Sequence, residues 1–261
     1  MRVPGTPSYV ISDLHLGFAQ PEIEHAALTF LRQVQGKAAS LIINGDLFEF
    51  WFEWRSVMPR RGFRVLAALA DLREAGTSVL MIAGNHDCWG GAILRDDVGI
   101  DYQIGAWEGD VAGWRCRIDH GDGLRPREDR RYRFVRRLLR NRAAIKAFRW
   151  LHPDLATRLA MGSSHASRKY GAEDEGRGLA RIAAETLAAR PDLELLIFGH
   201  SHVAALERMT ARGIYANAGA WLDSPTFLRV TPERIELRRW DGSAEGLYLH
   251  GLDRSAEKAL A

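Results

Sequence analysis

Residues 195–202 read LLIFGHSH, an apolar run followed at once by a glycine and two histidines with one serine between them. Four consecutive apolar residues that end at a turn residue are typical of a buried strand. Two histidines at such a strand end indicate that a ligand lies at that edge of the sheet. Four other stretches also change from apolar residues to Asp, Asn or His. They are YVISDLH (9–15), LIINGD (41–46), VLMIAGNHD (79–87) and RIDHGD (117–122).

The order of these runs predicts an α/β fold. Short apolar runs alternate with longer amphipathic stretches through the first 90 residues, which predicts βαβ units around a largely parallel sheet. The last 60 residues favour a strand meander that would form a second sheet packed on the first. Strands are expected at residues 8–12, 40–44, 78–83, 115–119, 194–198, 213–216, 226–230 and 234–239, and helices at 22–35, 60–75, 129–140, 143–151 and 173–189.

The size and composition favour a single cytoplasmic domain. A chain of 261 residues can bury a sizeable core, and we expect one domain over 1–261 with a helical lid insertion at about 123–175. The apolar runs are far shorter than the ~20 residues of a spanning helix, and the N-terminus lacks a secretory signal pattern. Cys88 and Cys116 form no CxxC, which argues against a disulfide framework and favours a reducing compartment.

The charge is concentrated in one segment. Residues 125–149 hold eleven Lys or Arg against two acids, although the net charge of the chain is only +3. Such a block predicts an anionic partner. Within 132–140, apolar residues at helical spacing alternate with arginines, which is typical of a basic helix at an anionic membrane surface. Two alternatives are a solvated helix that covers the core and a nucleic-acid surface. No recognised nucleic-acid module accompanies the segment, so no nucleic acid is expected.

The residues at the five strand ends predict a metal centre. Carboxylates and imidazoles together suit Mn, Fe or Zn, and the absence of thiolates argues against a structural zinc site. Two ions ~3.5–4 Å apart would use all these groups, as in hydrolases of phosphate esters. Taken singly, an Asp here could be a turn residue and a His a core residue; their joint occurrence favours metal. The side chains are Asp13, His15, Asp46, Asn85, His86, His120, His200 and His202.

The five motifs together resemble the calcineurin-like metallophosphoesterases in order and spacing, from residue 8 to about 220. They are DxH, GDxxE, GNHD, HGD and GHSH, which begin at residues 13, 45, 84, 120 and 199. The resemblance implies a four-layer αββα sandwich of two mixed β-sheets with a dinuclear centre. It implies that Asp13, His15, Asp46 and His202 hold one ion, and that Asp46, Asn85, His120 and His200 hold the other.

Three longer segments are similar to the UDP-2,3-diacylglucosamine diphosphatases of lipid A synthesis. They read GDLFEFWFEW, HGDGLRPREDRRYRFVRRLLRN and RWLHPDLATRLA, and that family has a helical insertion after its HGD motif. The similarity implies cleavage of the substrate's pyrophosphate to UMP and 2,3-diacylglucosamine 1-phosphate. The chain departs from the family at His86, where many members have arginine, and at WFEW (51–54), where the usual continuation is glycine and two acids.

The same similarity supplies expected roles. Asn85 would touch the phosphoryl group as well as a metal, His86 would stabilise the transition state or protonate the leaving oxygen, and Asp87 would orient the His86 ring. Asn85, Asp129, Tyr132 and Ser167 are expected to contact the substrate. We expect two divalent ions, Mn²⁺ first with Fe or Zn as alternatives, an acylated UDP-sugar as substrate, and no obligate protein partner.

The expected location is the cytoplasm, peripherally on the inner face of the cytoplasmic membrane. One alternative function keeps the metals and changes the substrate to another nucleotide diphosphate, a phosphodiester or a phosphomonoester. A second is a non-catalytic basic module that binds membrane or nucleic acid; the complete set of ligand residues argues against it.

Overall fold

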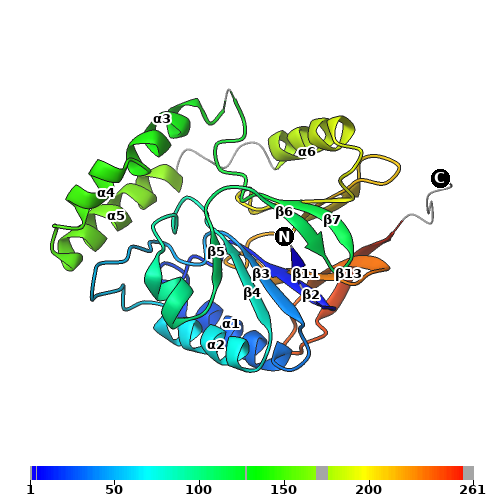
Figure 1. Cartoon of the computed structure of the whole chain (residues 1–261), viewed down its shortest axis with the longest axis horizontal. Helices are drawn as coiled ribbons and strands as arrows, with labels where there is room; N and C mark the ends of the chain where they lie inside the picture. Colours follow the sequence, from blue (N-terminus) through cyan, green and yellow to red (C-terminus); the bar gives the residue numbers. More distant parts are fainter. Residues whose placement is uncertain (1, 4, 127, 169–175, 255–261) are drawn as a thin grey trace.

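Two mixed β-sheets form the centre of the molecule (Figure 1). The computed structural model describes residues 2–3, 5–126, 128–168 and 176–254, without the side chains at 2, 131 and 163–168. Within these residues one sheet has seven strands in the order β13-β12-β11-β2-β3-β4-β5, and the other has six in the order β1-β6-β7-β8-β10-β9.

The seven-stranded sheet has a parallel half and an antiparallel half. β2, β3 and β4 are parallel, as the apolar runs predict, and β5, which the sequence does not predict, pairs parallel with β4. β11 joins the other side of β2 in the antiparallel direction. The bounds are β2 Ser8–Ile11, β3 Ser40–Asn44, β4 Ser78–Ile82, β5 Asp101–Gln103, β11 Thr226–Val230, β12 Arg234–Arg239 and β13 Leu247–Asp253.

The expectation for the last 60 residues was therefore wrong in part. β11, β12 and β13 do form a meander, but they extend the sheet of β2 instead of building a second one. All residues of β2 are buried, so this strand lies in the middle of a sheet and needs a hydrogen-bonded partner on both edges. β11 supplies the second partner.

The six-stranded sheet includes several strands that the sequence does not predict. β7, β8 and β10 run parallel, and β6 pairs with β7 as a hairpin whose turn, Ala112–Gly113, has positive φ at both residues. The bounds are β1 Arg2–Val3, β6 Trp107–Val111, β7 Trp114–Ile118, β8 Leu195–Phe198, β9 Ala205–Arg208 and β10 Ile214–Asn217.

Helices cover the outer face of each sheet, which confirms the four-layer αββα sandwich. Val10 and Ile42 of one sheet pack with Ile118 and Ile197 of the other between the layers. α1 (Pro21–Val34) and α2 (Phe63–Glu74) cover the seven-stranded sheet, and α6 (Arg177–Ala189) covers the six-stranded one. A short π-helix (Ile93–Asp97) precedes β5.

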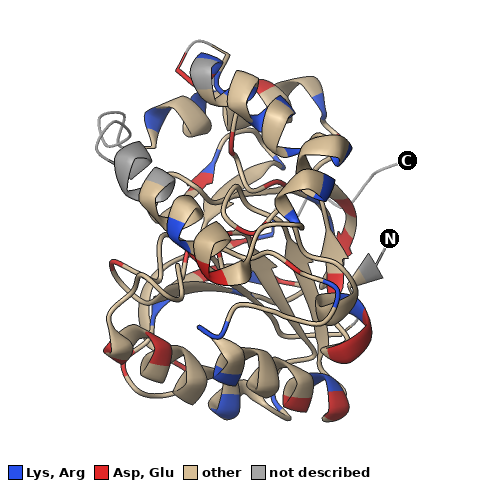
Figure 2. Ribbon diagram, turned by 90° about the vertical axis from the view of Figure 1, so that its left-hand side faces the viewer, with Lys and Arg blue, Asp and Glu red and all other residues tan. Residues whose placement is uncertain are grey.

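Three helices lie between β7 and α6, in the segment where the sequence predicts a helical insertion, and we call them the lid. They are α3 (Arg130–Leu139), α4 (Arg142–Phe148) and α5 (Pro153–Arg168), and they lie together at one end of the molecule (Figure 1). The sequence predicts α3 and α4 but not α5, which begins at a proline. Lys and Arg outnumber Asp and Glu on these helices (Figure 2). In the part of the chain that is described, no helix is both long and apolar enough to span a membrane.

Candidate metal centre

The carboxyl ends of five strands meet at one edge of the sandwich. Three of them, β2, β3 and β4, belong to one sheet, and β7 and β8 belong to the other. Backbone hydrogen bonds tie the loops together, because Asp13 N–H donates to Gly45 O (3.1 Å) and Gly199 N–H donates to His120 O (2.9 Å). The side chains that follow these strands are Asp13, His15, Asp46, Asn85, His86, His120, His200 and His202.

Five of these residues have a backbone conformation that non-glycine residues rarely adopt. The φ angle is 54° at Asp13, 49° at His15, 51° at Asp46, 62° at His200 and 61° at His202. Such conformations cost of order 1 kcal/mol each and persist only where the surrounding structure enforces them. The loops thus hold strain at the residues that the sequence predicts as ligands.

Asp13, His15 and His202 form one group of donor atoms that fits a metal ion. Asp13 Oδ1 lies 3.9 Å from His15 Nε2 and 3.6 Å from His202 Nε2, and the two Nε2 atoms are 3.3 Å apart. Asp13 and His15 are buried, and His202 is half-buried. Three donor atoms thus face one another from loops that are 187 residues apart in the chain.

Asp46, His120 and His200 form a second group of the same kind. Asp46 Oδ2 lies 3.2 Å from His120 Nε2 and 3.9 Å from His15 Nε2 of the first group. Asp46 is therefore the one carboxylate of the eight strand-end residues that is close to both groups, which is the position expected for a bridging ligand.

The unsatisfied atoms at this edge fit divalent ions. Among the described residues, no hydrogen-bond partner reaches the buried atoms Asp13 Oδ1, Asn85 Oδ1 or His120 Nε2. A buried polar atom without a partner costs free energy that coordination of an ion would offset. These oxygen and nitrogen donors without thiolates match the set that Mn, Fe and catalytic Zn accept.

Outer partners fix the orientation of three imidazoles. His15 Nδ1 lies 3.0 Å from Glu49 Oε2, and His202 Nδ1 lies 3.1 Å from Asp223 Oδ2. His120 Nδ1 lies 2.8 Å from the backbone oxygen of Asn44. Because each partner is an acceptor, each Nδ1–H donates and each Nε2 faces the site.

The ionisable groups influence one another strongly. Although burial raises the pKa of Asp46, the charges of His120 and His86 hold it well below its usual value. Burial lowers the pKa of His120, but the negative charge of Asp46 has the larger effect. The pKa of His120 therefore lies well above its usual value. Burial and then the charge of His120 lower the pKa of His200 to about 3. His200 is thus a neutral imidazole, the form that binds metals.

The loop after β4 holds His86 in a defined orientation, but through a different contact from the one expected. The His86 ring donates from Nδ1 to the backbone oxygen of Glu49 (2.8 Å). Both carboxylate oxygens of Asp87 instead accept backbone N–H groups, from Gly84 (2.7 Å) and Leu47 (2.8 Å). Burial and then the Asp46 charge raise the pKa of Asp87 to about 7. Asp87 thus shapes the loop, whereas Glu49 orients the ring.

Three of the four expected substrate contacts, all except Asn85, belong to the segment of the insertion. Tyr132 donates to Asp122 of the HGD motif (2.7 Å), which places it at the metal edge. Asp129 is buried and accepts the backbone N–H and the guanidinium of Arg125, so its carboxylate is an internal ion-pair partner here. Ser167 lies in α5, in the stretch whose side chains are outside the described part. Substrate contact by these three residues stays a prediction.

The sequence of the chain is similar to one family over most of its length. The model of the calcineurin-like phosphoesterase family matches residues 6–204, which include both donor groups. The chain belongs to this family. It is a metal-dependent hydrolase.

Curated relatives are similar over most of the chain. The UDP-2,3-diacylglucosamine hydrolase of Porphyromonas gingivalis is 31% identical over 216 residues, which cover 75% of this chain and 82% of the relative. The enzyme of the same name from Serratia proteamaculans is 31% identical over 235 residues, 87% of this chain and 96% of the relative. Among solved structures, Chaetomium thermophilum Vps29 gives a TM-score of 0.47 at 12% identity, over 96% of this chain and 99% of its own.

Two residues of the site have roles that the strand-end pattern did not reveal. Asp223 contacts His202 but lies in the turn before β11, outside all five motifs. Asp122 belongs to the HGD motif, yet its buried carboxylate accepts Tyr132 and lies 3.4 Å from Arg136 Nε and 3.6 Å from Arg140 Nη2. An acid two positions after a proposed ligand and shortly before an arginine-rich helix was the available signal for Asp122.

Proposed function

We propose that the protein hydrolyses the pyrophosphate of UDP-2,3-diacylglucosamine to UMP and 2,3-diacylglucosamine 1-phosphate. The observation that carries this proposal is the attachment of the lid to the metal edge through Asp122. Tyr132 and Arg136 of α3 both donate to this residue, which lies two positions after the proposed ligand His120. Curated relatives that are similar over most of the chain are named for this substrate.

The ligand sets are those that the resemblance implies. Asp13, His15, Asp46 and His202 would hold one ion, and Asp46, Asn85, His120 and His200 the other. When bound, the two divalent ions, Mn²⁺ in this proposal, lower the pKa of a water molecule and neutralise charge on the phosphoryl oxygens.

His86 supplies the proton that the leaving group needs. The His86 Nδ1–H donates to the backbone oxygen of Glu49, so the ring's Nε2 points away from Glu49. A ring protonated at Nε2 as well can give this proton to the leaving phosphate oxygen as the bond to phosphorus breaks. Asn85 presents an unsatisfied amide oxygen at the same edge and completes the polar surface around the phosphoryl group.

The lid carries exposed apolar side chains that would receive the two acyl chains, such as Leu155 and Leu159 of α5, which are 50% and 55% exposed. Phe50, Phe52 and Trp54 follow the Asp46 loop and pack with Ala156 of α5. Phe148 of α4 contacts the same cluster, with its ring 4.9 Å from that of Phe52. Each buried methylene contributes ~0.8 kcal/mol, so partial burial of two acyl chains is enough to select an acylated substrate. An acylated substrate also suits an enzyme that associates peripherally with the inner face of the cytoplasmic membrane.

Product analysis tests the proposal directly. Purified protein with Mn²⁺ and detergent-dispersed UDP-2,3-diacylglucosamine should release UMP, and Asp46→Asn, which removes the shared carboxylate, should not. The matched substrate is UDP-N-acetylglucosamine, which lacks the long acyl chains and should react far more slowly. Equal turnover of both would contradict the acyl selectivity and favour the alternative, a hydrolase of other nucleotide diphosphates. The observation that favours this alternative is His86, because many members of the diphosphatase family that the chain resembles have arginine at this position.

A further inference from the structure

Helix α3 has one side at the metal edge and another side that faces away from it. Tyr132, Arg136 and Arg140 contact Asp122 and define the first side. Phe134 and Leu138 lie between these positions in the sequence, so they project from the opposite side of the helix. Their side chains are 74% and 61% exposed.

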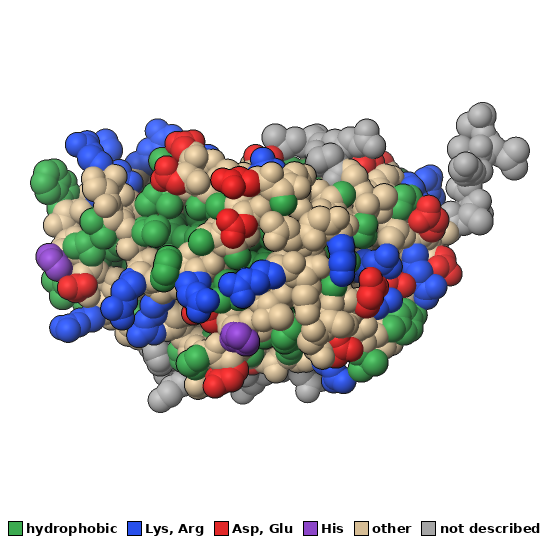
Figure 3. Space-filling model, turned by 90° about the horizontal axis from the view of Figure 1, so that it is seen from below, with side chains coloured by type: hydrophobic (Ala, Val, Ile, Leu, Met, Phe, Trp, Pro, Cys, Tyr) green, Lys and Arg blue, Asp and Glu red, His purple; other side chains and the backbone are tan. Residues whose placement is uncertain are grey.

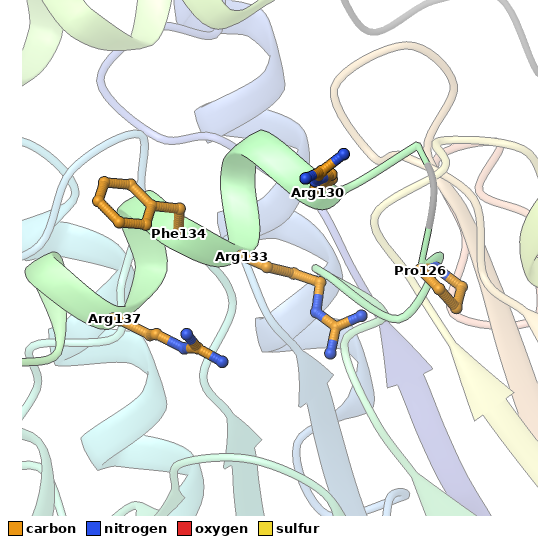
Figure 4. A pocket seen from close by; sticks show the side chains of 5 residues that line it. All are labelled: Pro126, Arg130, Arg133, Phe134 and Arg137. Carbon is orange, nitrogen blue, oxygen red and sulfur yellow. The ribbon is translucent and has the colours of Figure 1, made fainter.

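A basic pocket lies beside these exposed apolar residues (Figure 4). It has a volume of about 210 Å³, several times that of a water molecule. Arg133 and Arg137 extend from the same side of the helix, and Pro126 lies on the segment that precedes it (Figure 4). None of the proposed metal ligands lines the pocket, which is formed by Pro126, Arg130, Arg133, Phe134 and Arg137.

The three pocket arginines differ from their neighbours in charge pairing. Arg125 is paired with Asp129, and Arg136 with Asp122. Within the described residues no ion pair involves Arg130, Arg133 or Arg137, and all three are exposed. All three line one hollow, and Arg133 and Arg137 extend from the same side of the helix. Guanidiniums so placed favour an anion with several oxygens, because each can donate two parallel hydrogen bonds to it.

We infer that this pocket seats the phosphate of an anionic phospholipid, with the bilayer surface against Phe134 and Leu138. The inference rests on the membrane association proposed above and assigns it to one side of one helix. A phosphate bound by arginine next to apolar side chains is the chemistry of a lipid headgroup above its acyl chains. Trp150, after α4, is 91% exposed and suits the same interface. The lid end of the molecule shows hydrophobic and basic side chains side by side (Figure 3).

Two matched pairs of arginine substitutions distinguish a specific phospholipid site from general electrostatic attraction between the basic lid and an anionic membrane. Arg133→Gln with Arg137→Gln removes two charges from the pocket. Arg142→Gln with Arg158→Gln removes two exposed charges from α4 and α5 outside it. The measurement is co-sedimentation with vesicles of phosphatidylglycerol and phosphatidylcholine, compared with phosphatidylcholine alone.

The pocket pair should lose at least about tenfold in partitioning to the phosphatidylglycerol vesicles, and the control pair less than about threefold. Equal losses would overturn the inference in favour of diffuse attraction, and no loss in the pocket pair would remove the site. Displacement of the wild type from vesicles by millimolar inorganic phosphate would show a site for free phosphate and would also overturn it.

UMP release from detergent-dispersed substrate distinguishes this inference from the proposed function. The pocket pair should keep wild-type turnover there, because the pocket is separate from the metal edge. Turnover that falls with the pocket pair would assign these arginines to the substrate and overturn the phospholipid site. A wild type that releases UMP but does not sediment with vesicles would end this inference and leave the function standing.

Discussion

Both ring nitrogens of His15 have polar neighbours, and these contacts show how single residues position the donor atoms of the metal edge. Its Nδ1 faces Glu49, and its Nε2 faces Asp13 and His202. Glu49 in turn accepts the His86 ring through its backbone oxygen. One residue therefore orients a proposed ligand with its side chain and a proposed proton donor with its backbone, and only the first contact is open to mutation.

Glu49→Gln should weaken metal binding without unfolding the protein. A glutamine can still accept a hydrogen bond but cannot stabilise the ring by charge, and loss of such a partner typically lowers metal affinity about 10- to 100-fold. Calorimetric titration of metal-depleted protein with Mn²⁺ measures this affinity. Glu53→Gln is the matched control, because Glu53 accepts the N–H groups of Ile93 and Leu94 and touches no proposed ligand. Equal affinities for the two variants would contradict the role of Glu49.

His86→Ala should lower kcat by about 10²- to 10⁴-fold and leave metal content unchanged. The ring is removed from a third group of donor atoms, that of His15, Glu49 and His86, but the groups of Asp13 and of Asp46 remain complete. Hydrolysis of a chromogenic phosphodiester gives kcat, and elemental analysis of the purified variant gives the metal content. Loss of metal together with activity would mean that His86 acts as a ligand instead.

The sequence predicts these residues well wherever they follow an apolar strand. Asp13, Asp46 and His120 lie where the strand-end pattern places them, because the carboxyl ends of parallel strands share an edge. Asp223 could not be predicted, since it follows no strand and reaches His202 only through the tertiary fold. The contacts of Asp87 could not be predicted either, because a neighbour in sequence need not face the adjacent ring.

At the scale of elements, the lid is attached at two places of different chemistry. α3 is tied to Asp122 by hydrogen bonds and charge, whereas α4 and α5 pack on the aromatic segment after β3. Trp54 Nε1 also donates to the backbone oxygen of Leu151, between α4 and α5. The apolar attachment includes Phe52 and Trp54 of the WFEW segment (51–54).

Phe148→Ala should loosen α4 and α5 without affecting the sandwich. The ring lies 4.9 Å from Phe52 and 6.2 Å from Phe50, and its loss should cost about 1–3 kcal/mol of local stability. Hydrogen–deuterium exchange should rise in residues 142–162 and stay unchanged in β2 to β4. Phe134→Ala, which removes an exposed ring from α3, should leave exchange in both regions at the wild-type rate. An equal rise of exchange in residues 142–162 of the Phe134→Ala variant would refute the packing role of Phe148.

Predictability of elements depends on burial. The buried strands β3, β8 and β11 lie within one residue of the predicted bounds, because each contains two or more consecutive apolar residues. β6 and β13 were missed because glycine and charged residues interrupt them, and their place is fixed by pairing with a neighbour. The helices α1 and α2 were predicted from periodicity, which tertiary packing preserves.

At the scale of the whole molecule, the metal edge joins the two sheets. Asp13, Asp46 and Asn85 come from one sheet and His120, His200 and His202 from the other. Without ions, buried donor atoms face one another across the layers with no partner among the described residues. Bound ions should therefore stabilise the packing of sheet on sheet as well as the site.

Removal of metal should lower the melting temperature and abolish hydrolysis together. An ion at a free concentration 100 times its Kd stabilises a folded protein by about 2.7 kcal/mol. Differential scanning calorimetry of chelated protein, titrated back with Mn²⁺, measures the shift beside the activity. Asp46→Asn should melt at the same temperature with and without Mn²⁺, because its shared carboxylate is gone; a normal shift in this variant would exclude Asp46 as the bridge.

β2 pairs with β3 on one edge and with β11 on the other, although β11 follows it by more than two hundred residues. When residues up to His202 have been synthesised, the nascent chain carries every proposed donor group. One edge of β2 still lacks its partner strand β11 at that stage. The donor groups are therefore all synthesised before the sheet that contains β2 can be completed. Premature termination between residues 203 and 225 would yield a product with complete chemistry and an open, aggregation-prone flank.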